Sequence, residues 1–534
     1  MERILTNYRE FLDERIQNYP AVPMYAYRDP AAKKRVEVLP AQFKAQVMAL
    51  AAYLLREGYE HKHVALLGAN SYNYVLARQA LLSCGCTVIF LDIRMETGEL
   101  MNLVVDSESR AIFYSAESEE KAMALSNACR VPLLAMSEIN AYMETGQRLR
   151  DEGKCLAEDV EIDPDALAFL FYTSGTTGRN KGVMLTQRSY IFDKCMEYGQ
   201  EKEATGDTVL LLPLSHVFAE TAHITTLMSG HTVFINQSAR RVFDDIRSER
   251  PEVMVLVPLF VQNLLDCLWK SIRDQGKEGE IRRQIAENRR NGSLTLDERR
   301  AMFAPELEIL GGRLYKIICG GAPVPPHLIW EFQDFGIDVL NGYGATECSS
   351  CIAVNQYGYN RLGSVGWPLM GTEIRIDNPD RNGEGEVCIR GTHVMLGYYH
   401  KPQETAEVLR DGWFHTGDRG YFDKDNYLYL TGRIKNIIIL SNGENVSPEE
   451  LERRVSEHSA VKEVQVYGEG EDIVAEIYPD LDYLRACRVD DFEGALRRYV
   501  LELNESLADY KRIHRVRFRS EPFEKTSSGK IRRK

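Results

Sequence analysis

Short apolar runs alternate with stretches of helical periodicity along most of the 534-residue chain, and this alternation constrains the fold more than any other feature. Such strand–helix alternation implies parallel sheets with helices on both faces. We therefore predict an α/β fold without solenoid repeats. The apolar runs lie at residues 64–67, 87–92, 208–213, 232–235 and 253–257, and helical patterns lie at 71–82 and 217–228.

Two later parts of the chain depart from this pattern. Residues 269–310 are dense in Arg, Glu, Gln and Lys, which predicts a surface helical hairpin that turns near Gly292. Beyond residue 363, Gly- and Asp-rich turns at 380–383 and 423–426 indicate an antiparallel section.

A domain boundary is expected at residues 432–435, because a compact αβ segment follows. That segment begins with a strand at 437–440 and continues with a helix whose start is the capping box at 447–450, with Pro at the first helical position. From residue 511 onward the sequence is rich in Lys and Arg, which favours a phosphate-bearing ligand there, although a solvated basic tail is the alternative.

Composition narrows the class of protein. Hydrophobic residues make up 44% and charged residues 27% of the chain, as in folded globular proteins, and the net charge of −14 argues against nucleic-acid binding. No apolar run is long enough to span a membrane, and the eleven cysteines follow no disulfide framework. We predict a cytoplasmic protein without a transmembrane segment, and peripheral membrane contact stays open. Cys348 and Cys351 have CxxC spacing without further metal ligands nearby, so we interpret them as two buried thiols.

Residues 171–183 read Phe-Tyr-Thr-Ser-Gly-Thr-Thr-Gly-Arg-Asn-Lys-Gly-Val and form the most informative motif. An apolar strand leads into Gly residues that allow tight turns, hydroxyl donors and a mobile positive charge, which together predict a polyphosphate site. An ordinary surface loop is the alternative, and a Walker A loop is excluded because Gly182 follows the lysine. The predicted phosphate-binding residues are Thr173, Ser174, Gly175, Thr176, Thr177, Gly178 and Lys181.

Four further motifs follow in order: Asn-Gly-Tyr-Gly-Ala-Thr-Glu at 341–347, His-Thr-Gly-Asp at 415–418, Gly-Arg-Ile-Lys at 432–435 and Thr-Ser-Ser-Gly-Lys at 526–530. At these separations the chain, from about residue 43 to its end, resembles the adenylate-forming superfamily of acyl-CoA synthetases, firefly luciferase and peptide-synthetase adenylation domains.

The resemblance implies both a fold and a reaction. The expected fold is a large N-terminal domain, residues 1–433, of two doubly wound β/α subdomains plus a small antiparallel β-barrel-like subdomain, followed by a small mobile C-terminal α+β domain, residues 434–534. The expected reaction joins a carboxylate to ATP to give an acyl-adenylate and pyrophosphate, after which a thiol displaces AMP.

The resemblance also assigns roles around the nucleotide. Thr173 and Glu347 are the expected Mg²⁺ ligands, since Mg²⁺ prefers oxygen ligands. Thr346 is expected at the α-phosphate, Asp418 at the ribose hydroxyls and Arg433 at ribose or phosphate. The expected adenine-contacting and loop positions are Gly320, Gly321, Ala322, Asn341, Gly342, Tyr343 and Gly344.

The resemblance assigns the adenylation step to Lys530, whose ammonium group would stabilise charge as the new bond forms. Lys435 matches the hinge about which the small domain rotates between the two half-reactions. Gly443 is expected to line the pantetheine tunnel. Luciferase-like members carry Lys where this chain has Ile439, so the second-step contacts differ here.

The substrate class is predicted from residues 214–220, Leu-Ser-His-Val-Phe-Ala-Glu. Amino-acid-activating relatives place an Asp in this region, and its absence disfavours an amino acid. The His-Val-Phe sequence is similar to the acyl-CoA synthetase branch, in which His216 would flank the acyl carboxylate. The charged segment 269–310 and the 411–418 motif resemble long-chain fatty acyl-CoA ligases.

We therefore predict an ATP-dependent fatty acid–CoA ligase with Mg²⁺ and CoA. Three alternatives stay open: transfer to the phosphopantetheine of an acyl carrier protein, an aryl-acid CoA ligase, and a catalytically silent nucleotide-binding or scaffold protein. The intact set of Lys181, Glu347, Asp418 and Lys530 disfavours the last.

Overall fold

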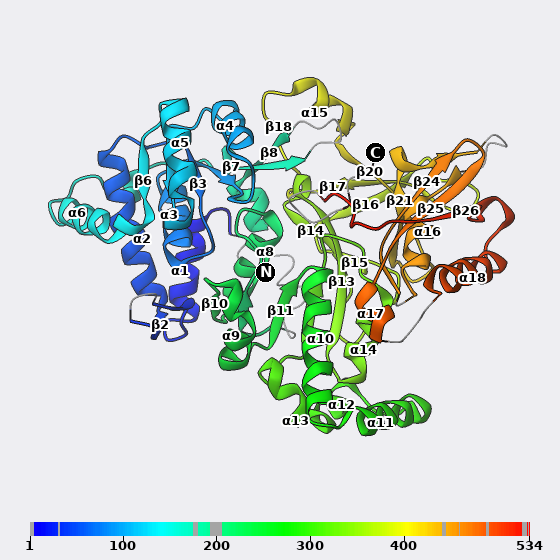
Figure 1. Cartoon of the computed structure of the whole chain (residues 1–534). Coiled ribbons are helices and arrows are strands. Elements are labelled where there is room, and N and C mark those ends of the chain that lie inside the picture. The colour runs from blue at the N-terminus through cyan, green and yellow to red at the C-terminus, as the bar shows by residue number, and fades with distance from the viewer. Residues whose placement is uncertain are drawn as a thin grey trace.

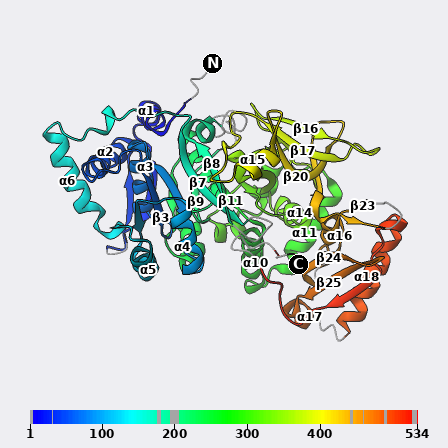
Figure 2. The ribbon, with the colours of Figure 1, turned by 90° about the horizontal axis from the view of Figure 1, so that it is seen from above.

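The computed structural model arranges the chain as sheets layered with helices, as the strand–helix alternation predicts (Figures 1 and 2). It describes residues 5–29, 32–174, 180–192, 205–440, 445–458, 460–486, 491–525, 531 and 533. Its α-helices in this part of the chain are α1 (Tyr8–Asn18), α2 (Pro40–Arg56), α3 (Tyr72–Ser83), α4 (Thr97–Asp106), α5 (Glu119–Cys129), α6 (Ile139–Asp151), α8 (Val217–Met228), α9 (Val242–Glu249), α10 (Pro258–Asp274), α11 (Glu278–Asn291), α12 (Leu296–Met302), α13 (Ala304–Leu307), α14 (Pro326–Asp334), α15 (Pro402–Val408), α16 (Pro448–Val455), α17 (Leu481–Ala486) and α18 (Phe492–Glu505).

The largest sheet has seven strands in the order β18-β8-β7-β4-β3-β5-β6. The five strands from β7 to β6 run parallel, whereas β8 and β18 are antiparallel additions. The described parts of the phosphate-loop motif, residues 171–174 and 180–183, therefore lie on the paired strands β7 and β8. The strands are β3 (His63–Leu67), β4 (Thr87–Leu91), β5 (Ala111–Tyr114), β6 (Leu133–Ala135), β7 (Leu167–Ser174), β8 (Asn180–Thr186) and β18 (Gly397–Tyr398).

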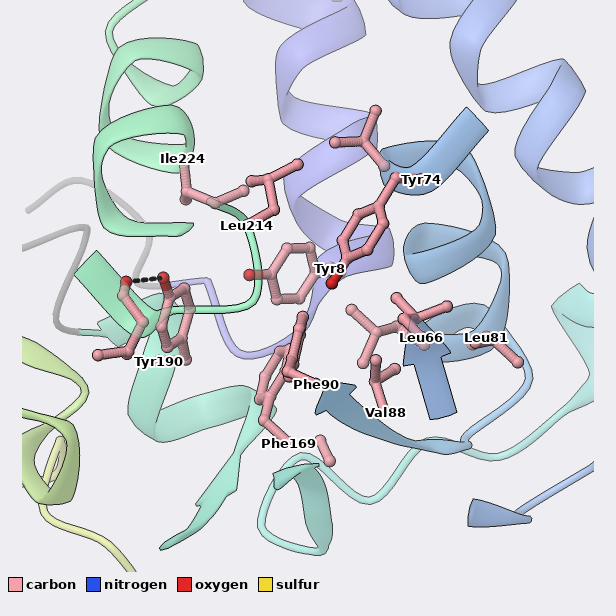
Figure 3. Close-up of a cluster of buried hydrophobic side chains, with 14 of the residues drawn as sticks. Tyr8, Leu66, Tyr74, Leu81, Val88, Phe90, Phe169, Tyr190, Leu214 and Ile224 are labelled. Atoms are coloured by element: carbon pink, nitrogen blue, oxygen red, sulfur yellow. Dashed lines mark hydrogen bonds between the residues drawn. The ribbon is translucent and has the colours of Figure 1, made fainter. Parts of the chain in front are cut away.

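Alternate residues of the central strands supply two different cores, because successive strand side chains point to opposite faces. On β4, Val88 and Phe90 join the core that contains α1, α2 and α3 residues, whereas Ile89 and Leu91 join the core with α4 and α5. The first core also includes residues of α8, such as Ile224, which Figure 3 shows on the same cluster as Phe90. Helix α8 therefore packs against the seven-stranded sheet, in the cluster that contains residues of β3, β4 and β7.

Two further sheets carry the second β/α unit. A four-stranded sheet has the order β2-β1-β10-β9, and a five-stranded sheet has the order β11-β12-β13-β14-β15. Helix α8 spans the predicted residues 217–228. The strands are β1 (Tyr25–Arg28), β2 (Arg35–Val38), β9 (Thr208–Leu210), β10 (Val233–Ile235), β11 (Val253–Leu256), β12 (Lys316–Cys319), β13 (Asp338–Ala345), β14 (Ser350–Val354) and β15 (Trp367–Pro368).

The charged segment 269–310 is helical and turns at Gly292, as predicted, because Gly292 ends α11 with a left-handed φ of 62°. It is more than a surface excursion, however. Ile281 and Ile285 of α11 are buried in the same core as Leu264 of α10 and Phe332 of α14. The apolar positions are few, but they share one helix face.

The antiparallel section predicted after residue 363 is a five-stranded sheet of β16, β17, β20, β19 and β21. The predicted turns at 380–383 and 423–426 connect β16 to β17 and β20 to β21. The strands are β16 (Glu373–Asp377), β17 (Gly385–Arg390), β19 (Leu409–Arg410), β20 (Trp413–Phe422) and β21 (Leu428–Arg433).

The C-terminal segment has its own core, which lies at the opposite end of the molecule from α1–α6 (Figure 1). Val446, Leu451 and Val455 pack with residues of a three-stranded sheet, β24-β25-β26. The strands are β22 (Ile438–Ile439), β23 (Asn445–Val446), β24 (Val461–Glu469), β25 (Asp472–Pro479) and β26 (Arg515–Phe518). No helix in the described residues is long and apolar enough to cross a membrane.

The capping box predicted at Ser447 is only half right. Helix α16 begins with Pro448, but the Ser447 hydroxyl makes no capping bond. It donates instead to the carbonyl oxygen of Thr431 in β21. Ser447 thus ties the start of the C-terminal segment to the antiparallel sheet.

Candidate active site

The first turn of α8, the end of β12 and β13 meet at Gly320. A Cβ atom on Gly320 would lie 3.2 Å from the carbonyl oxygen of Gly342 and 3.3 Å from Cζ of Phe218, so any other side chain would crowd both neighbours. Gly321 follows with a positive φ of 78°, and the exposed Ala322 comes next. The predicted adenine-lining segments at 320–322 and 341–344 therefore lie side by side.

The predicted 341–347 loop is largely a strand. Strand β13 extends to Ala345, and Thr346 and Glu347 lie in the short 3₁₀ helix that follows, both partly exposed. Gly344 is required here, because a Cβ atom would lie 1.4 Å from the Ser350 carbonyl oxygen. Asn341 uses its amide nitrogen to bond the Ser364 carbonyl at 2.9 Å, which anchors the strand.

Lys181 and Glu347 meet through Tyr398. The Tyr398 hydroxyl donates to Glu347 Oε1 at 2.9 Å, and the Lys181 ammonium lies 4.7 Å from the centre of the Tyr398 ring. Lys181 also pairs with Glu404 at 2.9 Å, and it stands opposite Thr173 in the β7–β8 register. Among the described residues only Tyr398 hydrogen-bonds the Glu347 side chain, so Oε2 is available to a hard cation.

Asp418 brings Tyr343 and Arg433 together. Arg433 Nε lies 2.7 Å from Asp418 Oδ1, and the Tyr343 hydroxyl donates to Oδ2. Burial and the negative charge of Asp418 raise the pKa of Tyr343, which keeps its proton for this bond. The buried Asp418 carboxylate thus has two neighbours that the sequence places at the nucleotide.

Positive charge accumulates beside this carboxylate. Partial burial and the positive charges of Arg433 and Lys181 lower the pKa of Lys435, while Asp418 opposes them. Arg433 and Lys181 therefore both lie close enough to Lys435 to act on it electrostatically. A concentration of cations of this kind suits a polyanionic ligand.

A partly buried network supports residues 415–418 of β20. Glu386 Oε1 accepts from the backbone of Gly417 at 3.0 Å, and Oε2 lies 2.8 Å from Nδ1 of His415. Asp377 and Cys388 complete a group of four whose polar atoms lie within 4.8 Å of one another, which is close enough for a metal ion. Arg375 and Arg410 already face its two carboxylates, at 3.7 and 3.8 Å, so we interpret the group as a support for Asp418.

His216 lies at the N-terminal end of α8 and contacts residues that follow β4. Its Nε2 lies 3.2 Å from Asp92 Oδ2 and 2.9 Å from Arg94 Nη2. Burial raises the pKa of Asp92, but the bonds from His216 and Arg94 outweigh it and hold that pKa below its usual range. Asp92 is accordingly ionised at neutral pH.

Part of the predicted site lies outside the described residues: Gly175, Thr176, Thr177, Gly178, Gly443 and Lys530. Of Ser174 the structure describes the backbone, which pairs with Asn180. The described residues Lys525 and Ile531 form an antiparallel bridge, and Arg533 bonds Glu452 of α16 at 2.5 Å.

Sequence reasoning missed Tyr398, Glu386, Asp92 and Arg94. Asp92 and Arg94 carried a usable signal, because they directly follow an apolar strand, where side chains reach the carboxyl edge of a parallel sheet. Tyr398 and Glu386 gave no local signal. They are close to the site only because β18 pairs with β8 and β17 with β20.

Comparison with family models assigns the chain to a class of enzymes. Residues 13–399 match the AMP-binding enzyme family, and residues 435–534 match the AMP-binding enzyme C-terminal domain. The chain therefore belongs to the AMP-binding enzyme family, which confirms the predicted adenylate-forming enzyme.

Three similar proteins illustrate the range of relatives. Long-chain-fatty-acid–CoA ligase FadD15 of Mycobacterium bovis is 28% identical over 504 residues, which cover 89% of this chain and 81% of the relative. Feruloyl-CoA synthase of an Amycolatopsis species is 30% identical over 417 residues, or 76% of this chain and 75% of the relative. The structure of o-succinylbenzoate CoA synthetase (MenE) of Bacillus subtilis with ATP and magnesium ion aligns with a TM-score of 0.74 at 24% identity, covering 98% of both chains.

The CoA ligase name agrees with the predicted use of CoA, and ATP and magnesium ion are the ligands of the MenE structure. The names of these relatives include both fatty and aromatic acids, so the family defines the reaction class more closely than the acid.

Proposed function

We propose that the protein is an ATP-dependent acyl-CoA ligase for a medium- or long-chain fatty acid. The carboxylate attacks the α-phosphate of ATP, which forms acyl-adenylate and releases pyrophosphate. The CoA thiol then displaces AMP to give the thioester. The convergence of Tyr343 and Arg433 on Asp418, beside Lys181 and Lys435, is the observation that carries this proposal.

A carboxylate is a weak nucleophile, and its charge repels the triphosphate it must attack. Neutralisation and positioning must therefore supply most of the catalysis. Lys181, Arg433 and Lys435 supply positive charge on the nucleotide side. Glu347 and Thr173 would hold Mg²⁺, which neutralises phosphate oxygens when bound. Thr346 would bond the α-phosphate, and the Asp418 carboxylate would accept both ribose hydroxyls.

We assign the adenylation step to Lys530, on the strength of its motif position. The same reasoning divides the chain into a nucleotide-binding domain, residues 1–433, and a mobile domain, residues 434–534, with Lys435 at the hinge. The separate core of residues 438–518 supports the division. In the second step Gly443 would line the pantetheine tunnel.

A fatty acid is favoured by the sequence around His216 and by relatives such as FadD15. The feruloyl-CoA synthase relative favours an aryl acid as the second candidate. Transfer to a carrier-protein phosphopantetheine is the alternative second step.

Hydroxylamine-trapped adenylation over a panel of fatty, aryl and amino acids tests the proposal. We expect turnover with medium- or long-chain fatty acids, followed by thioester formation on free CoA. Turnover confined to aryl acids would select the second candidate, and turnover with carrier protein alone would select the alternative acceptor. Failure with every carboxylate would reject the ligase function.

A further inference from the structure

Arg94 is held rigidly by a buried carboxylate at the carboxyl end of β4. Its Nε lies 2.9 Å from Asp92 Oδ1, and its Nη2 lies 2.6 Å from Asp92 Oδ2. The backbone nitrogen of Arg94 also donates to Asp92 Oδ1, at 2.9 Å. The Asp92 side chain is 7% exposed, whereas that of Arg94 is 50% exposed. One end of the pair is thus anchored in the fold and the other faces solvent.

The guanidinium has an open edge at Nη1. A guanidinium carries five N–H donors in a planar fork, and Asp92 takes the side formed by Nε and Nη2. His216 Nε2 lies 2.9 Å from Nη2. Among the described residues none hydrogen-bonds Nη1, so its two donors point away from the anchor. Nη1 can therefore donate to one oxygen of a carboxylate, whose negative charge the guanidinium complements.

His216 joins this edge to the nucleotide side. It directly precedes α8, and the Phe218 ring of α8 lies against the backbone of Gly320. Arg94 lies on the opposite side of β7 from Lys181, because the strand order is β8-β7-β4. Strand β7 thus stands between β8, which carries Lys181, and β4, which leads to Arg94. Two anionic groups can therefore be bound separately, one at each cation.

We propose that Arg94 binds the carboxylate of the acyl substrate through its open edge, and that Asp92 is a positioning residue that holds the guanidinium in place. The inference rests on the proposed ligase function and names the group that recognises the acid. Arg94 orients the carboxylate beside His216, while Lys181 holds phosphate on the other side of β7.

Steady-state kinetics of the full chain test this assignment, with the best acid of the wild-type panel and hydroxylamine trapping. We expect Arg94→Gln to raise KM for the acid by about tenfold or more, and to leave KM for ATP within about twofold. Arg94→Lys should restore part of the loss, since it keeps the charge without the fork. Arg150→Gln is the matched control, because Arg150 forms a two-bond pair with Glu158 on the surface.

Asp92→Asn tests the positioning role. It should raise KM for the acid in the wild-type background and add little in Arg94→Gln, because both changes remove the same contact. If Asp92 were purely structural, Asp92→Asn would instead lower the melting temperature, and its effect would be the same with and without Arg94.

A second measurement is independent of specific activity. The wild type should prefer a fatty acid to the matching fatty alcohol as a ligand, and Arg94→Gln should lose this preference. An unchanged acid KM and preference in Arg94→Gln would overturn the assignment, as would a rise in KM for ATP alone. Failure of the ligase function is distinct, since the wild type itself would then activate no acid.

Discussion

Arg433 and Asp418 face each other across β20 and β21, with Nε 2.7 Å from Oδ1. The second Asp418 oxygen accepts from Tyr343. Protein side chains therefore contact both carboxylate oxygens that we expect to accept the ribose hydroxyls. A nucleotide that binds there must replace these contacts. The pairing orients the Asp418 carboxylate before the nucleotide arrives.

Asp418→Ala should therefore weaken nucleotide binding selectively. We expect KM for ATP to rise by about 30- to 100-fold, because two charge-assisted hydrogen bonds are lost. Calorimetric titration with AMP provides the direct measurement. Asp165→Ala, which breaks the surface pair with Arg188, is the control and should leave AMP affinity unchanged. Equal AMP affinity in Asp418→Ala and wild type would contradict the ribose assignment.

Tyr398→Phe removes the hydroxyl that bonds Glu347 but keeps the ring beside Lys181. We expect the Mg²⁺ concentration for half-maximal adenylation to rise about fivefold, which corresponds to a hydrogen bond of about 1 kcal/mol. Tyr399→Phe is the matched control, because its hydroxyl bonds Glu108 instead. The same Mg²⁺ dependence in both variants would remove Tyr398 from the cation site.

Lys530→Ala separates the two half-reactions. We expect adenylation to fall by about 100-fold or more, because the lost charge acts only as the bond forms. Thioester formation from preformed acyl-adenylate should stay within about twofold of the wild type. Stopped assays of each half-reaction measure the two rates, and the exposed Lys462→Ala serves as control. Equal losses in both steps would contradict the assignment.

Glu452 makes the stability of the C-terminal segment depend on pH. Burial raises the pKa of Glu452 from 4.5 to about 7, although Arg533 opposes the shift. Between these values the folded state binds more protons than the unfolded state, so stability falls as pH rises. Glu452→Gln lacks this ionisation, and its stability relative to the wild type should increase from about pH 5 to about pH 8, by at most about 3 kcal/mol.

Urea unfolding of both proteins at the two pH values measures this difference. The exposed Glu457→Gln lies just beyond the same helix and should give a difference from wild type that is independent of pH. If the stability difference between Glu452→Gln and the wild type is also independent of pH, the Glu452 carboxyl group has an ordinary pKa in the folded protein.

Local elements of the fold could be predicted from the sequence because their causes are local. Helix α8 spans the predicted residues, and the turn at Gly292 follows from the conformational freedom of glycine. The motifs likewise predicted Lys181, Tyr343, Glu347 and Asp418 as members of one site, and the structure links them in two groups through Tyr398 and Arg433.

Only the tertiary structure determined which side chains support that site. Tyr398 bonds Glu347 across 51 residues of sequence, and Arg94 reaches His216 across 122. Ser447 is at a helix-cap position in the sequence, yet its hydroxyl donates to Thr431, because packing against β21 brings that carbonyl oxygen within reach. Periodicity and turn chemistry act over a few residues, whereas these partners are selected by strand pairing and by packing between sheets.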